Sequence, residues 1–312
     1  MIRREADIID VIGVNGDFCR VSPKEMSWGP ELAPGSQGLY DMPIQTNWAP
    51  YAFGQFFQSW KPKRRNIVWT INIANPDAPG QYLTQDSDLW HSIYARWKAM
   101  FSPTYEATIA YTSTDGQRTL GVRIVDTPKP FSAHNFEGRD PSLFAFGSVV
   151  QTMGCELPFY VGKTDRFEWE VETNGDFWFP LPYYNPASID GWPEWHLTGG
   201  ATYQLPDFSY GSEAYGRGVA DIGKTIKLAS LLNDEDLEIQ TRPDLETFVT
   251  SLETNFAGRM AGRDFEYPIA PGAGDKEKGC IVRASVSNPA GARLELVLPR
   301  WYDEPFSTAR VA

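Results

Sequence analysis

Residues 218–225, GVADIGKT, match the phosphate-binding pattern G-x-x-x-x-G-K-[ST] at every fixed position. In that motif backbone amides hold the phosphates, the lysine (here Lys224) neutralises them, and the threonine (here Thr225) binds magnesium. The motif lies between a buried apolar strand and a helix, but SYGSEAYGR precedes it and the alternating TIKLAS follows it. We therefore interpret the segment as a loop that enters a strand, and we expect no nucleotide cofactor.

The densest aromatic and polar cluster is GWPEWHLTGGATYQLPDFSYG, residues 191–211. Glu194 and Asp207 are the residue types of a glycoside hydrolase acid–base pair, and Trp192 and Tyr203 are types that stack on sugar rings. No spacing selects these two carboxylates from the 40 acidic residues of the chain. Core or interface packing is the usual role of aromatic side chains in β-rich domains.

Other catalytic chemistry finds little support in the residue types. The chain has three histidines, and His91, on a predicted helix, has no second His or Cys nearby, so it is predicted to be a surface residue and not a metal ligand. The nucleophile pattern G-x-S-x-G is absent from the sequence. We therefore predict a protein that is not an enzyme, with no catalytic residue, no cofactor-binding residue and no metal site.

The composition favours many short strands. Aromatic residues make up 14% of the 312 residues, with 24 prolines and 27 glycines, a balance typical of strands joined by turns. The formal net charge of −12 should repel nucleic acid and anionic membranes. The one tight basic cluster, KPKRR at 61–65, is interpreted as a solvated strand entry or a local contact.

The cysteines and the N-terminal sequence indicate a cytoplasmic origin. Three widely separated cysteines argue against a disulfide framework and fit a reducing cytosol. The N-terminal MIRREADIID has acidic residues where a signal peptide needs an apolar run. We expect a soluble protein that is made inside a cell and has no membrane partner.

The first half of the chain reads as strands around one helix. NIVWTINIA, 66–74, alternates with its isoleucines and Trp69 on one face. DSDLWHSIYARWKAMF, 86–101, has helical spacing with a cap at Asp86. A hairpin with a turn at Asp115 and Gly116 follows.

Residues 22–62 combine Trp and Tyr with Pro and Gly in no regular period. This composition predicts an extended, loop-rich arm with two short strands, of the kind that wraps a partner. In a lone monomer such an arm would expose larger apolar patches than a soluble chain tolerates. We expect a neighbouring subunit to cover it.

The second half reads as a two-sheet sandwich, with a domain boundary near residue 165 and no convincing helix. Alternation places Trp195 and Leu197 on one face of a strand and Glu194 and His196 on the other. The aromatic cluster at 191–211 is thus predicted to be a half-buried hairpin whose polar side chains face water.

Six stretches follow one another along the chain: GLYDMPIQT (38–46), the aromatic helix with its following hairpin, GWPEWHLTGGA, EIQTRPDLETFVTS, GRDFEYPIAPG and LPRWYDEPF (298–306). In this order and spacing they resemble the distal tail proteins of long-tailed phages (siphoviruses). The resemblance is strongest to those of phages that infect actinobacteria, which are often called minor tail proteins. Each stretch alone consists of turn and strand residues, so the resemblance rests on their order, which covers nearly the whole chain.

The resemblance implies a mainly β fold of two domains. Residues 1–165 would form a belt domain, a split β-barrel with one flanking helix that is built like a tail-tube subunit. Residues 166–312 would form a galectin-like β-sandwich.

The resemblance also implies a structural virion protein of the tail tip, made in the host cytoplasm. It would form a homo-oligomer, a hexameric ring that joins the tail tube protein to the baseplate hub (tail-associated) protein around the DNA channel. The tape measure protein is a further candidate partner in the lumen. DNA would pass without specific binding, which an acidic protein favours.

The alternative function is a carbohydrate-binding module or a cell-wall hydrolase that uses the aromatic cluster of the C-terminal domain. The two hypotheses differ in an observable way. A ring former should oligomerise without sugar, whereas a lectin should gain stability from one.

Overall fold

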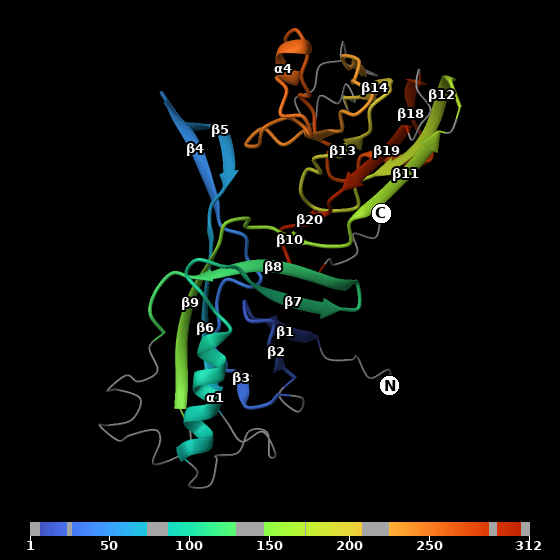
Figure 1. Ribbon diagram of the computed structural model, residues 1–312. Helices are drawn as coiled ribbons and strands as arrows, with labels where there is room; N and C mark the ends of the chain where they lie inside the picture. Colours follow the sequence, from blue (N-terminus) through green and yellow to red (C-terminus); the bar gives the residue numbers. More distant parts are fainter. Residues whose placement is uncertain are drawn as a thin grey trace. The chain divides into compact units, whose positions relative to one another are not determined.

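The computed structural model describes residues 7–23, 27–73, 87–128, 147–171, 173–207, 225–286 and 292–306. The fold is mainly β, with 50% of the described residues in strands and 7% in helices. Two compact units make up the chain, Met1–Gly162 with Tyr302–Ala312, and Lys163–Trp301 (Figure 1).

The first unit is a nearly closed, barrel-like sheet. Its two end strands, β2 and β3, lie against each other. The strands follow in the order β2 (Phe18–Ser22), β1 (Ile8–Ile12), β7 (Ala107–Ser113), β8 (Gly116–Ile124), β9 (Gly147–Cys155), β6 (Arg65–Ile73) and β3 (Pro30–Leu32), with β10 (Tyr160–Val161) paired to β8.

Strand β6 shows why the barrel forms. Ile67, Trp69, Ile71 and Ile73 are all fully buried while the residues between them are not, as the period of two requires. The strand pairs with β9 along its whole length. The predicted strand and its buried face are confirmed.

Helix α1 (Ser87–Ala99) packs its aromatic stripe on this barrel. Trp90 and Trp97 are fully buried, and the Trp97 indole donates a hydrogen bond of 3.0 Å to Gln151 on β9. His91 is exposed, as predicted. The predicted cap, Asp86, lies outside the described residues.

The hairpin after the helix turns one residue earlier than predicted. Ser113 pairs with Gly116, so Thr114 and Asp115 link the strands and Gly116 begins β8. Gly116 has φ +107°, a backbone region that residues with a Cβ seldom adopt. The glycine is therefore needed beside the turn and not within it.

The arm predicted over residues 22–62 is more regular than expected. After the short β3, it forms a long two-stranded hairpin of β4 (Ile44–Tyr51) and β5 (Gly54–Pro62). The prediction of a loop-rich segment was wrong because the described residues cover neither face of this hairpin, so burial imposes no alternating pattern on its sequence.

The second unit is a β-sandwich with a shared core. Trp195, Leu197 and Leu296 from one sheet pack with Tyr203 and Leu205 from the other. The five-stranded sheet runs β11 (Asp165–Val171), β19 (Ala292–Leu298), β13 (Glu194–Leu197), β16 (Leu237–Gln240), β17 (Phe248–Thr250), and the four-stranded sheet runs β12 (Gly175–Tyr184), β18 (Gly274–Val286), β14 (Ala201–Pro206), β15 (Thr225–Lys227).

A single-turn helix, α4 (Phe256–Arg259), also belongs to this second unit, where the sequence predicted none. Asn255 caps it by accepting a hydrogen bond of 2.8 Å from the Gly258 amide. Four residues are too few for a helical period to show in the sequence.

The end of the chain returns to the first unit. The sequence placed all of 166–312 in the second domain, but the first unit resumes at Tyr302, inside β20 (Trp301–Tyr302). Tyr302 and Phe306 pack against the barrel core. The fold prediction of a split barrel with one flanking helix and a sandwich is confirmed.

Candidate interaction surface

The phosphate-binding motif is only partly visible, because residues 218–224 lie outside the described residues. Thr225 opens β15, as the interpretation of a loop entering a strand requires. Its hydroxyl accepts a hydrogen bond of 2.6 Å from Gln204 on the paired strand.

The two carboxylates considered for hydrolysis do not form a catalytic pair. Asp207 is 1% exposed and accepts hydrogen bonds from the backbone amides of Glu266 (3.2 Å) and Tyr267 (3.1 Å). Glu194 lies on β13 in the opposite sheet, where burial raises the pKa of its carboxyl above the ordinary value. Asp207 therefore organises a loop, because its oxygens are occupied by the backbone.

The alternative sugar platform of Trp192 and Tyr203 is not formed. Tyr203 is 2% exposed, and its hydroxyl donates to the backbone oxygens of Thr198 (3.0 Å) and Arg293 (3.3 Å). Burial raises the pKa of Tyr203 to about 12. Trp192 is half-buried, and Trp195 is fully buried, so this aromatic cluster mainly fills the core.

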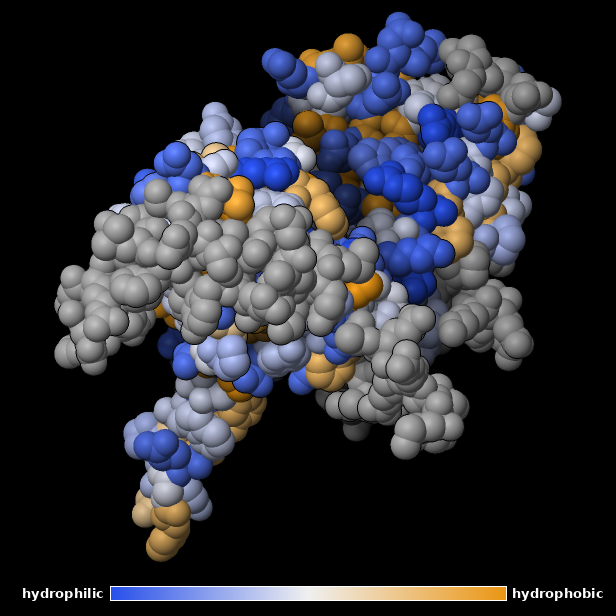
Figure 2. All heavy atoms as spheres, turned by 90° about the horizontal axis from the view of Figure 1, so that it is seen from below, coloured by the Kyte–Doolittle hydropathy of each residue, from blue (hydrophilic) through white to orange (hydrophobic). Residues whose placement is uncertain are grey.

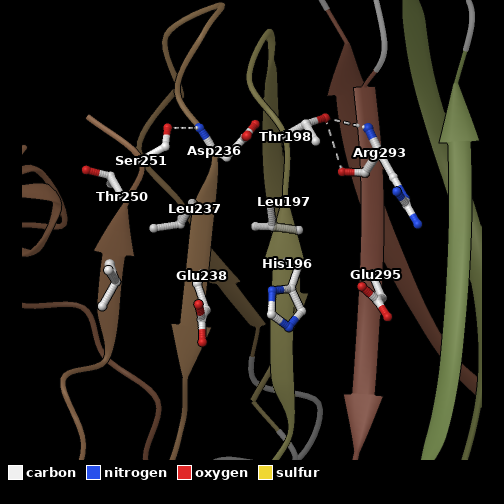
Figure 3. A pocket seen from close by; sticks show the side chains of 11 residues that line it. His196, Leu197, Thr198, Asp236, Leu237, Glu238, Thr250, Ser251, Arg293 and Glu295 are labelled. Carbon is white, nitrogen blue, oxygen red and sulfur yellow. Dashed lines mark hydrogen bonds between the residues drawn. The ribbon is translucent and has the colours of Figure 1, made fainter. Parts of the chain in front are cut away.

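An open groove of about 370 Å³ runs over the outer face of the five-stranded sheet (Figure 3). His196 is paired across the strands with Glu238 on one side and Glu295 on the other. Glu295 forms a 2.6 Å ion pair with Arg166. The described residues that line this groove include no Phe, Tyr or Trp, and its side chains are those of a solvated sheet face.

No metal site is evident in the described parts of the chain, where no group of three or more His, Cys, Asp or Glu could hold an ion. None of the helices in those ranges has the length and apolar character of a membrane span. Cys19 and Cys155 are free and buried, and burial raises the pKa of each thiol to about 12.

The most unusual surface is the β4–β5 hairpin. All nine residues of β5 are exposed, and large apolar side chains stand in water along both strands. Figure 2 shows one projecting arm with apolar surface at its end, and Phe53 at the hairpin turn is 92% exposed. A lone two-stranded hairpin is marginally stable in water, and in the described residues neither strand is covered by a second layer.

The register of the hairpin sorts its side chains onto two faces. Paired residues share a face, and the pairs Thr46 with Trp60 and Trp48 with Phe57 place the aromatics together. The Trp48 and Phe57 rings meet edge to face at 5.5 Å. We call Ile44, Trp48, Phe57 and Trp60 the apolar face; each is 49–54% exposed.

The opposite face is polar near the root of the hairpin. Asn47 donates a hydrogen bond of 2.9 Å to Ser59 across the strands, and Gln45 pairs with Lys61. We call these four residues the polar face. An extra residue in β5, Gln58, shifts the register and aligns Phe57 with Trp48.

The sequence contains a signal for this hairpin that its irregular pattern hides. The linking residues are Ala52 and Phe53, and Gly54 begins the returning strand with φ +143°. The hairpin of β7 and β8 uses a glycine, Gly116, at the same position. The bulge at Gln58 breaks the alternation that would otherwise have marked β5.

Arg65 fixes the root of the hairpin. Its side chain is fully buried and donates hydrogen bonds to four backbone carbonyls, those of Gly38 (3.2 Å), Leu39 (2.8 Å), Pro158 (2.9 Å) and Asp303. Burial lowers the pKa of the guanidinium. The stretches 38–46 and 298–306, which are far apart in sequence, thus meet at one buried cation.

Comparison with solved structures finds proteins of similar architecture. The Dit protein of phage SPP1, described as a paradigm of the hub adsorption apparatus of phages that infect Gram-positive bacteria, aligns over 95% of this chain and 99% of its own, with a TM-score of 0.55. The fold resembles that of a phage Dit protein. The two sequences are 10% identical, so the likeness is one of fold.

A chain of the phage P2 baseplate, in its activated conformation with Ca, aligns over 96% of this chain and all of its own at a TM-score of 0.46 and 10% identity. No protein-family profile matches this sequence, and no curated protein matches it either.

Proposed function

We propose that this chain is a structural protein of a phage tail tip, a ring-forming adaptor between the tail tube protein and the baseplate hub protein. The observation that carries the proposal is the uncovered apolar face of the β4–β5 hairpin, on a barrel whose fold resembles that of Dit. Covering a large apolar side chain contributes about 1.5–3 kcal/mol, and four stand together on this face.

In this proposal the first unit is the belt domain and six copies close around the DNA channel. The ring lies at the tail tip of a phage that infects actinobacteria, and it assembles in the cytoplasm of the host. The tape measure protein occupies the lumen of the ring before DNA passes. The net charge of −12 supports a channel that DNA crosses without specific binding. The chain acts by its shape and contacts and not as an enzyme.

The test is the size and shape of the purified full chain. Light scattering at high protein concentration should give a mass of about six times 35.1 kDa, and class-averaged electron micrographs should show closed rings. A chain that stays monomeric at every concentration would contradict the proposal.

A second candidate function, sugar binding, is favoured by a groove away from the predicted aromatic cluster. Trp178 on β12 is 54% exposed and lines an open groove of about 220 Å³ on the four-stranded sheet, together with Asp176, Gln204 and Lys227. An exposed indole beside polar side chains is the combination that holds the apolar and hydroxyl faces of a sugar ring.

Intrinsic fluorescence tests this candidate. Titration with galactose, glucose and N-acetylglucosamine to molar-scale concentrations should change the emission of the full chain, and Trp178→Ala should abolish the change. Trp192→Phe is the matched control. An unchanged emission with all three sugars would remove the candidate and leave the ring proposal untouched.

A further inference from the structure

The first unit carries another exposed apolar surface, on the outside of the barrel. Ile12 and Phe18 are directly paired across β1 and β2 and are 43% and 50% exposed. The half-buried Trp28 packs in part against the barrel core, and its indole donates a hydrogen bond of 2.8 Å to the backbone carbonyl of Phe18. We call Ile12, Phe18 and Trp28 the barrel patch.

Charged side chains hold the rim of this patch in place. Arg96 lies over the Trp28 ring at 4.2 Å and forms a two-bonded ion pair with Asp17 (2.7 and 2.9 Å). The hydrogen bonds from Arg96 hold the pKa of Asp17 below its ordinary value. An aromatic centre with a fixed polar rim is the usual anatomy of a protein interface.

The hairpin and the barrel patch are both exposed within one copy of the chain, so neither covers the other there. We propose that the apolar face of the hairpin docks on the barrel patch of a neighbouring copy, and that this contact joins successive subunits. The inference rests on the proposed ring and names the two surfaces that would form it.

A head-to-tail contact accounts for the exposure better than a symmetric one. Two hairpins that packed face to face would cover their apolar faces but leave both barrel patches in water. When one copy's hairpin meets the next copy's patch, every subunit buries both surfaces, and repetition of the same contact forms a ring when the rotation between subunits closes.

Charge also favours a second copy as the occupant. Lys61, Lys63 and Arg64 lie exposed at the root of the hairpin, in a chain whose formal net charge is −12. Another copy therefore offers an acidic partner to the one tight basic cluster of the sequence, and opposite charges guide such an encounter.

Mixing two complementary variants tests the contact. Trp48→Glu places a charge on the hairpin's apolar face, and Phe18→Glu places one on the barrel patch. Each variant alone should be monomeric at a concentration where the unsubstituted chain forms rings. Ser59→Glu, on the polar face, is the matched control and should still form rings, and circular dichroism should show all three folded.

The equimolar mixture is the decisive sample. Each Trp48→Glu copy keeps an intact patch and each Phe18→Glu copy keeps an intact hairpin, so the mixture should form pairs of one and one. The average mass should rise up to twofold, and no further, because the remaining surfaces are blocked.

Three outcomes would overturn the inference while leaving the proposed ring intact: rings formed by Phe18→Glu alone, rings formed by Trp48→Glu alone, or a mixture that stays monomeric beside an unsubstituted chain that forms rings. A monomeric unsubstituted chain would instead contradict the proposed function itself.

Discussion

Two aromatic-rich segments of this protein have opposite surroundings. In the sandwich, Trp195 and Tyr203 lie on facing sheets and are buried. In the hairpin, Trp48 and Trp60 lie on one face and remain half exposed. The residue types are the same, so the difference comes from whether the chain supplies a second layer. An aromatic segment without one indicates a surface that another molecule covers.

Trp195→Ala should have the largest effect, because Trp195 is fully buried in the sandwich core. We expect it to destabilise the second unit by about 3–5 kcal/mol, the range for large-to-small core substitutions. Hydrogen exchange of the β13 and β16 amides measures this for the second unit alone. Glu194→Ala, whose side chain is on the other face, should cost less than about 1 kcal/mol. Equal and small losses of stability in the two variants would mean that the inward and outward faces of β13 are wrongly assigned.

Arg65→Met should test whether the exposed hairpin stands on a rigid base. The substitution removes the Arg65 donor from the buried carbonyl of Pro158, and it leaves the carbonyl of Leu39 with the Tyr160 hydroxyl alone. A buried carbonyl that loses its donor costs about 1–3 kcal/mol. We expect the first unit to lose about 2–4 kcal/mol, read from exchange of the β6 and β9 amides. Arg64→Met, at an exposed neighbour, is the control and should change little.

Glu235→Gln should change how the stability of the second unit depends on pH. Glu235 is fully buried and accepts hydrogen bonds from Arg259 (2.7 Å) and Thr254 (2.6 Å). Burial alone would raise its pKa, but these bonds and one from the Leu232 amide outweigh burial and lower the pKa.

Because the folded-state pKa is depressed, the ionised Glu235 stabilises the fold above its unfolded-state pKa, and this contribution is lost as pH falls through the folded value. The variant should be less stable by about 2 kcal/mol at pH 7, from the loss of a charge-assisted bond, and the difference should shrink toward pH 3. Urea unfolding of both proteins between pH 7 and 3 measures it. A constant difference at every pH would contradict the ionised assignment.

Trp48→Ser should have the smallest effect on folding. Its side chain is 52% exposed and packs mainly on Phe57, so the free energy of unfolding should change by less than about 0.5 kcal/mol. Dilute samples, in which subunits are dissociated, avoid a contribution from assembly. A loss comparable with that of Trp195→Ala would show that the hairpin face is buried within one copy.

The sequence predicts elements well where burial is complete within the chain. The buried face of β6 and the aromatic stripe of α1 follow from their periods, because each packs on the barrel core. The same logic placed Trp195 inward and His196 outward in β13. In these elements the residues that form the apolar pattern and the residues that bury them belong to the same polypeptide.

The hairpin could not be predicted as well, because no second layer from the described residues of one copy covers its faces. Its two faces appear only when the register and the bulge at Gln58 are known. The role of Arg65 was also missed, since a basic cluster at 61–65 gives no sign that one of its members is buried under four carbonyls. Tyr203 and Asp207 were considered as surface groups, although contacts distant in sequence bury both.

The carbonyl of Asp303, which completes the Arg65 site, lies 238 residues downstream of Arg65. This separation delays the formation of the site during synthesis of the chain. At translation speeds of about 5–20 residues per second, roughly 12 to 48 s separate the synthesis of these two residues. During that interval the nascent barrel lacks its last hydrogen-bond acceptor and the aromatic packing of Phe306. The site of four carbonyls around Arg65, at the root of the hairpin, is thus complete only after translation has passed residue 303.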